Sequence, residues 1–388
     1  MPFNQLSIKF EIITPLFISG LNQRDNDFSL SSFKGVLRFW WRSLALSQLG
    51  DLQKVRNAEK MIFGGSEKEF GKSKILFKLD YLNYQLKSID FSKYKGVTYL
   101  GYGLINYKGK TDRKYSWPTT TGAISLIYKE EPDDLNLVIE SLKALSLFGG
   151  IGSRSRRGFG SFNIISIKQD EKEIFQRPNS LEKLQFTLKN FCAQNRISEY
   201  KPIPSYSAFS NNTRVDILQM GSDPLILLNE FGKKFLTYRS YGRYGKVLGN
   251  TSEQNFASDH DLIVNSLKTK VNENPKRIIF GLPHNYYFSS IGTNIDVNAS
   301  KEKRRASPLF INILKLNEHE FIVITLILRS QFLPSNNKIV IQPKRGSSSI
   351  VQLKDDWNVI TDFLEGFEGP YLRKSNKLRF DKRIQIFP

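Results

Sequence analysis

The segment of the chain richest in potential chemistry is a glycine-rich basic loop at residues 149–161, with the sequence GGIGSRSRRGFGS. Its glycines permit positive φ angles and let backbone N–H groups approach a ligand closely. Its arginines add fixed positive charge that can make bidentate contacts to phosphate. A flexible basic loop without a dedicated ligand is the alternative interpretation. The combination predicts a site for a nucleic-acid backbone, formed by Gly150, Gly152, Arg154, Arg156, Arg157, Gly158 and Gly160.

This loop differs from the common phosphate-binding motifs of nucleotide enzymes. It lacks the GK[ST] ending of a P-loop. It also does not open a helix after a strand, as a GxGxxG fingerprint does. The loop therefore predicts no nucleotide cofactor, and we expect no cofactor of any kind.

A second basic feature lies on a helix predicted over Phe33–Leu49. Its apolar side chains recur at spacings of four, three and four, so they share one face. Lys34, Arg38 and Arg42 recur every four residues on an adjacent face. This stripe predicts binding of RNA or of an acidic partner subunit, and a merely solvated face is the alternative. Trp41 lies at the border between the two faces. It either covers apolar surface in the core or stacks on a base.

Basic residues also cluster in the second half of the chain. At residues 238–246, YRSYGRYGK, cations alternate with tyrosines, a pattern that fits single-stranded nucleic acid. Arg304 and Arg305 stand beside Lys303 in KEKRRASPL, Arg345 follows Lys344, and the tail at 373–383 carries six cations. A solvated surface is the alternative interpretation of each cluster.

The net charge also favours a polyanionic partner. Lys and Arg total 57 against 37 Asp and Glu, which gives +20 and a pI near 9.7. Such an excess repels itself unless an anion lies nearby. Nucleic acid is the first candidate and an anionic membrane surface the second, while scattered solubilising lysines are the alternative. No apolar run is long enough for a membrane span, and we expect no membrane partner.

Signals for catalysis, metal binding and secretion are weak. The single cysteine, Cys192, excludes an internal disulfide and a multi-cysteine zinc site. The start of the chain has the pattern of a strand and not of a signal peptide, so we expect a cytoplasmic protein. Adjacent residues such as Asp259, His260 and Asp261 seldom all point at one ion, so no metal is expected. His284 is the best candidate for a general base, yet no partner for it is visible.

The elements that must position these residues follow one order in the first half: strand, helix, strand, strand, helix, strand. This is the order of the split βαβ or ferredoxin-like unit. Ser31 or Ser32 is the expected N-cap of the basic helix. A polar segment, Lys168–Ser180, is predicted to join the two halves. The strands are expected at Leu6–Ile13, Lys74–Leu79, Ala123–Tyr128 and Ser161–Ile167, and the second helix at Asp133–Phe148.

The second half has a similar order of elements but no clear residue-level repeat. We therefore predict an α+β fold with two ferredoxin-like (RRM-like, split βαβ) domains in tandem, at residues 1–172 and 173–388. The expected elements are strands at Lys276–Gly281, Phe310–Leu316 and Phe321–Leu328, the last two joined as a hairpin, and helices at Pro224–Tyr238 and Asp355–Phe363.

The two basic motifs together resemble those of the RAMP proteins of CRISPR systems. The helix FKGVLRFWWRSLA contains the pattern KG-x-LR-x-WWR, which is more specifically similar to the first RAMP subunit of the Cmr-type (type III-B) effector complex. The glycine-rich loop is shared across RAMP proteins. The segment RRASPL at 304–309 also resembles that subunit.

The resemblance implies two ferredoxin-like domains that face each other, in an antiviral ribonucleoprotein of prokaryotes. It implies contact with guide RNA and target RNA near the guide 3′ end, beside other RAMP subunits, one of which cleaves the target. We therefore expect a non-catalytic RNA-binding subunit. A metal-independent endoribonuclease that processes guide RNA and a purely protein-bridging subunit are the alternatives. An RNA-binding role carries over to the loop residues above and to Lys34, Arg38, Trp41, Arg42, Arg304 and Arg305.

Overall fold

The structure is a computed structural model of the chain. It describes residues 3–19, 27–66, 71–84, 88–116, 120–130, 132, 134–288, 291–302, 304–344, 346–366, 379–380 and 382–388. Among the basic residues singled out in the sequence, Lys303, Arg345, Arg373, Lys374 and Lys377 lie outside these ranges.

The first sheet has five antiparallel strands in the order β2-β3-β1-β4-β5. Alternate side chains of the central strand β1, such as Leu6, Ile8 and Phe10, are fully buried, as the period of a strand with one covered face requires. The last strand continues this sheet past the boundary predicted after Lys172. The strands are β1 (Asn4–Ile12), β2 (Leu76–Asn83), β3 (Thr120–Tyr128), β4 (Phe162–Gln169) and β5 (Lys172–Gln176).

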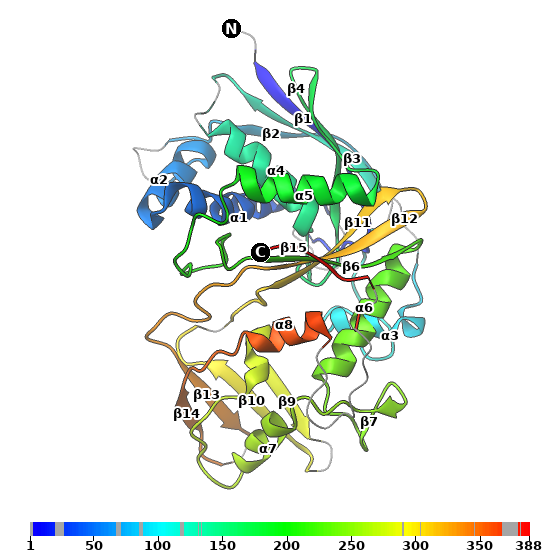
Figure 1. Ribbon diagram of the computed structural model, residues 1–388, viewed down its shortest axis with the longest axis vertical. Helices are drawn as coiled ribbons and strands as arrows, with labels where there is room; N and C mark the ends of the chain where they lie inside the picture. The colour runs from blue at the N-terminus through cyan, green and yellow to red at the C-terminus, as the bar shows by residue number, and fades with distance from the viewer. Residues whose placement is uncertain are drawn as a thin grey trace.

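Helices cover one face of this sheet (Figure 1). The predicted N-cap of α1 was wrong: the Ser29 hydroxyl, and not Ser31 or Ser32, accepts from a backbone N–H, that of Ser32. The helix therefore starts one turn earlier than its apolar pattern indicates, because the first turn carries small polar residues. The helices of this half are α1 (Leu30–Leu49), α2 (Leu52–Phe63), the 3-10 turn η1 (Phe91–Lys93), α3 (Lys95–Leu100), α4 (Leu135–Phe148) and α5 (Leu181–Gln194).

The second sheet has four antiparallel strands in the order β11-β12-β6-β15. Strands β11 and β12 form the predicted hairpin. Two helices follow its strands in the chain, near the predicted positions. The elements are β6 (Arg214–Gly221), α6 (Pro224–Arg239), β11 (Leu309–Asn317), β12 (Glu320–Ile327), α8 (Asn358–Glu365) and β15 (Ile384–Phe387).

The strand predicted at Lys276–Gly281 was wrong, because this segment is the 3-10 turn η2 (Lys276–Phe280). Two of its backbone N–H groups donate to the carboxylate of Asp259, at 2.8 and 2.9 Å from Lys276 and Arg277. The buried carboxylate of Asp259 therefore accepts hydrogen bonds from two N–H groups that would otherwise pair with a neighbouring strand.

A third sheet, in the order β14-β13-β10-β9, was not predicted from the sequence. Its strands alternate between buried and less buried side chains, but they are only four to seven residues long, and such short patterns were not recognised as strands. It lies at one end of the molecule, with the first sheet at the other end and the second sheet between them (Figure 1). The elements here are β7 (Lys246–Val247), β8 (Asn250–Thr251), α7 (Ala257–Asn265), β9 (His284–Phe288), β10 (Thr293–Ala299), β13 (Lys338–Pro343) and β14 (Ser349–Gln352).

The second sheet is buried on both faces. Phe310 and Leu314 of β11 belong to an apolar cluster shared with α1 and α4 of the first half. Ile311 and Ile313 face the opposite way, into a cluster shared with α3 and α6. The prediction of a mixed α and β fold with antiparallel sheets is thus confirmed. In the described part of the chain, no helix combines the length and apolarity that crossing a membrane requires.

Candidate nucleic-acid interface

The glycine-rich loop is a packed structure held by its own backbone. Ser153 N donates to Phe17 O at 2.7 Å, and Gly160 N donates to Pro15 O at 3.0 Å, so the loop is fastened to the segment after β1. Gly160 has φ +59°, and a Cβ there would lie 2.1 Å from Ile151 O. This close approach requires glycine. The loop is therefore a preformed surface, and the packing argues against the flexible alternative.

The three arginines of the loop have different environments. Arg154 is exposed, and one of its guanidinium nitrogens donates to Tyr102 O. Arg156 is half-buried: its guanidinium lies 4.4 Å from the centre of the Phe310 ring and donates to Ser307 O at 2.7 Å. Arg157 is also partly exposed. Packing thus accounts for much of the position of Arg156, whereas Arg154 is held by Tyr102 O and keeps an exposed side chain.

The RRASPL segment of the second half meets this loop. Burial and the neighbouring charge of Arg304 lower the pKa of Arg154. Burial and Arg305 lower the pKa of Arg156 to about 10, and burial and Arg239 lower that of Arg157 to about 10. With a pKa of about 10, Arg156 and Arg157 stay protonated at neutral pH. Like charges gathered in this way are stabilised by an anion between them.

Arg305 is itself tied into the second half. Its guanidinium donates to the Ser330 hydroxyl at 2.8 Å and lies 5.7 Å from the centre of the Phe332 ring. Burial lowers its pKa. Arg304 remains exposed. The structure thus brings together the loop and Arg304–Arg305, two sites that the sequence places about 150 residues apart.

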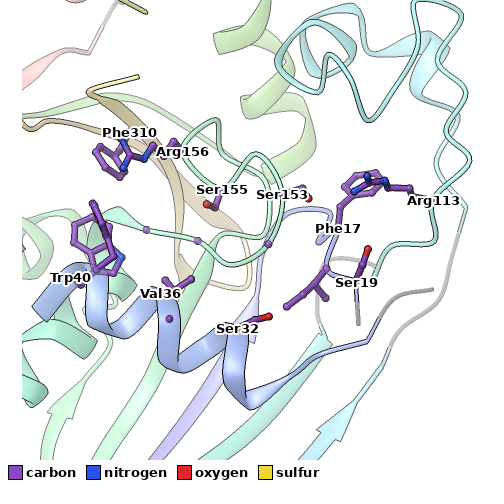
Figure 2. Close-up of a pocket in the computed structure, with 16 residues that line it drawn as sticks. Phe17, Ser19, Ser32, Val36, Trp40, Arg113, Ser153, Ser155, Arg156 and Phe310 are labelled. Atoms are coloured by element: carbon purple, nitrogen blue, oxygen red, sulfur yellow. The ribbon is translucent and has the colours of Figure 1, made fainter. Parts of the chain in front are cut away.

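A groove of about 650 Å³ runs between the loop and the first turns of α1. Figure 2 shows Ser32 and Val36 on the helix, and Ser153, Ser155 and Arg156 on the loop across from them. Arg113 lies at the far end. None of the described residues that line the groove is acidic. Its remaining lining residues include Ser19, Gly35, Phe39, Gly149, Gly150, Gly152 and Phe310.

The basic stripe of α1 faces away from this groove, toward α2. Arg38 Nε and Arg42 Nη1 lie 2.6 and 2.7 Å from the same oxygen of Glu59, which is only 8% exposed. Lys34 Nζ donates to Phe63 O at 2.9 Å, and burial together with Arg38 lowers the pKa of Lys34. These three cations therefore fasten α2 onto α1. Arg38 and Arg42 keep a little over a third of their side chains exposed.

Trp41 is fully buried, with its ring 6.1 Å from that of Phe63. Of the two roles open to it in the sequence, the structure places it in the core, so its ring is not at the surface where a base would stack. The free energy gained by burying the large ring beside α2 is greater than the free energy that an exposed ring would gain by stacking on a ligand.

Sequence reasoning missed the residues of α1 that do line the groove, Ser32, Gly35 and Val36. The signal was Gly35 in the middle of a helix, where glycine is unfavourable and indicates a close approach or an open surface. A Cβ built at Gly35 meets nothing within 4 Å, so this glycine leaves the groove open. Arg113 had no signal, because it stands in a segment without a regular pattern.

The candidate general base and the candidate metal ligands all contact other side chains of the protein. Burial, with Arg239 and Arg277, holds the pKa of His284 well below its ordinary value. Asp259 is buried and ion-paired with Arg277, while His260 stacks on Tyr241. Among the described residues, no group of three or more His, Cys, Asp or Glu side chains is placed to hold a metal ion.

Comparison with known proteins identifies relatives of this chain. The RAMP superfamily model matches residues 9–163. CRISPR system Cmr subunit Cmr1-1 of Pyrococcus furiosus is 27% identical over 347 residues, which cover 86% of each chain. Cmr subunit Cmr1-2 of the same organism is 29% identical over 41% of this chain and 94% of its own.

Solved structures share the fold. The crystal structure of Cmr1 from Pyrococcus furiosus superposes with a TM-score of 0.60 over 99% of this chain and 98% of that chain, at 17% identity. A chain of the type III-B Cmr-beta complex bound to cognate target RNA gives 0.53 over 94% and 98%, at 16% identity. The resemblance to the RAMP superfamily, and within it to the first RAMP subunit of the Cmr-type (type III-B) complex, is therefore confirmed.

Proposed function

We propose that this protein is a cytoplasmic, non-catalytic RNA-binding subunit of a type III-B CRISPR effector ribonucleoprotein. In this proposal it contacts guide and target RNA near the guide 3′ end, beside other RAMP subunits, in antiviral defence. The sequence relatives are named as Cmr subunits, and a structural relative is a chain of a Cmr complex bound to target RNA. These names support the assignment to such a complex.

We also infer that both halves are ferredoxin-like units. Strands β1, β2, β3 and β4 lie in the order β2-β3-β1-β4, and β6, β11, β12 and β15 lie in the corresponding order β11-β12-β6-β15. A helix follows the first strand in each half (α1 after β1, α6 after β6), and another precedes the fourth (α4 before β4, α8 before β15). This order supports the split βαβ unit. The third sheet is then formed by two insertions, β9–β10 between α6 and β11 and β13–β14 between β12 and α8.

One observation carries the proposed RNA binding: the groove between the loop and α1, without acidic lining and beside clustered arginines. The serine hydroxyls and glycine N–H groups of the groove can donate hydrogen bonds to phosphodiester oxygens, and the arginines can neutralise the phosphate charge. Contacts of this type carry no base specificity. The proposal therefore predicts binding to single-stranded RNA of any sequence, weakened by salt with a log–log slope near −0.7 per contacted phosphate.

A substitution at Gly35 tests the groove directly. Because a Cβ at Gly35 meets nothing within 4 Å and Gly35 lines the groove, Gly35→Glu is the substitution that brings a carboxylate to this surface. We expect it to raise the Kd for a fluorescein-labelled single-stranded 20-nucleotide RNA at least about fivefold over Gly35→Gln, a loss of roughly 1 kcal/mol. The glutamine variant is the control, since it has the same shape without the charge. Equal affinities of the two variants would remove the groove from the RNA path.

The fate of the RNA in the same binding reactions tests the non-catalytic assignment. Samples incubated in EDTA are divided between native and denaturing gels. Shifted and intact RNA is the expected result. RNA shortened in proportion to protein across independent preparations would instead assign a metal-independent endoribonuclease. No shift at moderate salt would favour a protein-bridging subunit.

A further inference from the structure

A second pocket, of about 710 Å³, lies in the second half of the chain. It is formed by the segment after α6, residues 240–247, together with His260 of α7, Arg277 of η2 and strand β9. Strand β9 is an edge strand of the third sheet and pairs with β10 alone. The pocket is lined by other residues than the groove beside the glycine-rich loop.

Aromatic rings form the wall of this pocket. Residues at i and i+2 point to the same face of a strand, and His284, Tyr286 and Phe288 stack in this way along β9. The His284 and Tyr286 rings lie 4.7 Å apart at 17°, and those of Tyr286 and Phe288 lie 6.2 Å apart at 7°. Tyr241 stacks on His260 at 3.9 Å and 10°. The wall thus holds two sets of nearly parallel rings, which meet at 67° where His260 lies against Phe288.

Two more tyrosines stand exposed at the pocket. Tyr244 is 88% exposed and Tyr287 is 68% exposed. Both rings are therefore still largely hydrated, and a base that stacks on either ring would displace this water. Rings in this position are what single-stranded nucleic-acid binding proteins use for successive bases.

The charge at this pocket is positive. Arg243 and Lys246 are exposed on its lining segment, and Arg277 lies behind Tyr286, 4.7 Å from the centre of its ring. None of the described residues that line the pocket is a carboxylate. Next to the lining, Asp259 is buried and paired with Arg277, and Asp261, 71% exposed, lies 3.0 Å from His260 Nδ1. The lining itself therefore attracts an anion.

Nδ1 of His284 and the hydroxyl oxygen of Tyr286 are buried and make no hydrogen bond of good geometry among the described residues, although Arg277 lies close to both residues. Buried polar groups are well paired in most native structures, so two poorly paired atoms in a pocket favour a ligand that supplies hydrogen bonds. The edge of a nucleobase offers both donors and acceptors.

We propose that this pocket binds one nucleotide unit of single-stranded RNA. Its base lies against Tyr244 with an edge toward His284, and its phosphate lies at Arg243 and Lys246. The next base along the RNA strand stacks on Tyr287, which points to the other face of β9. The volume falls in the range of sites that hold a ligand of this size. The choice of RNA as ligand rests on the proposed function, whereas a nucleotide as the ligand class rests on the pocket alone.

The test uses the full chain and a fluorescein-labelled single-stranded 12-mer of uridine or adenosine at 0.1 M salt. We expect Tyr244→Ala and Tyr287→Ala each to raise the Kd roughly fivefold or more, since one stacked base contributes that much. Tyr244→Phe and Tyr287→Phe keep the ring and should stay within about twofold of the wild type. Tyr107→Ala, at another exposed tyrosine (81%), should also bind as the wild type does.

The outcomes separate this inference from the proposed function. Unchanged affinity in both alanine variants, with binding still weakened by Gly35→Glu, would overturn the pocket and leave the groove standing. Calorimetric titration with AMP and with UMP forms the second arm. If wild type binds a free nucleotide and Tyr244→Ala does not, while the 12-mer fails to bind, the ligand is a free nucleotide and the RNA assignment is overturned.

Discussion

His284 connects the chemistry of a single residue to the stability of the whole chain. Burial, with Arg239 and Arg277 nearby, lowers its pKa far below 6.5 in the folded protein. The unfolded chain then takes up a proton first as pH falls, so this contribution to stability is present above about pH 6.5 and is lost below it.

We predict that the free energy of unfolding falls by about 1.4 kcal/mol per pH unit below pH 6.5 because of His284 alone. Urea titrations at pH 7.0, 6.0 and 5.5 measure this slope. His284→Gln should have a shallower slope over that window. His319→Gln, at an exposed histidine, serves as the control and should follow the wild type. Equal slopes in all three proteins would contradict the burial of an uncharged imidazole.

At the same scale, residue types predicted the arginines of the loop but not their division of labour. Arg154 and Arg304 were singled out, and the structure places them near each other and exposed. Lys34, Arg38 and Arg42 were singled out with equal reason, yet Glu59 of another helix attracts two of them. The choice between RNA and a protein carboxylate depends on a residue that no local pattern relates to the stripe. Sequence alone therefore located the basic residues and could not assign each to a partner.

At the scale of elements, helices α3 and α6 show that the role of a glycine within a helix depends on what packs against it. A Cβ at Gly96 would lie 2.0 Å from Asn229 O, and one at Gly232 would lie 2.3 Å from Gly96 O. The two helices thus touch backbone to backbone. Gly35 of α1 also stands in a helix, but its surroundings are open. Helical periodicity predicted α1 and α6, and it gave no sign of this difference.

We predict opposite effects of alanine at these two glycines. Gly232→Ala should destabilise the protein by about 1–3 kcal/mol, because the helices must separate to admit a methyl group. Gly35→Ala should stabilise it by about 0.5–1 kcal/mol, because alanine is the better helix former and has room here. Thermal and urea unfolding of both variants measure the two effects. A Gly232→Ala variant as stable as the wild type would mean that α3 and α6 are not in contact in solution.

Over the whole molecule, the two halves are joined through the second sheet, whose strands have apolar side chains on both faces. The runs FINILKL and FIVITLIL predicted the hairpin, and their continuous apolar character follows from burial on two sides. The third sheet escaped prediction because its alternating strands are only four to seven residues long. Lys315 is the exception within β11: a lysine 7% exposed, in contact with Glu11 of β1. That contact is an ion pair between the first strand of the chain and the second half.

The whole-molecule prediction concerns this ion pair. Lys315 Nζ lies 2.9 Å from Glu11 and 2.8 Å from Glu318, which are 7% and 79% exposed. Glu11 also pairs with Arg177 at 3.0 Å. Glu11→Ala leaves buried cations without their buried partner and should cost about 3–5 kcal/mol. Glu318→Ala removes an exposed partner of the same lysine and should cost at most about 1 kcal/mol.

Urea unfolding monitored by tryptophan fluorescence measures both variants. Because Glu11 lies between the halves, its loss should also separate their transitions, so that two unfolding steps replace one. A single step with equal, small losses in both variants would show that apolar contact across the second sheet, and not this ion pair, holds the halves in register. In that case the ion pair would neutralise the charge of the buried lysine but add little to the free energy of unfolding. The groove at the glycine-rich loop, which draws on both halves, would then be expected to survive the loss of Glu11.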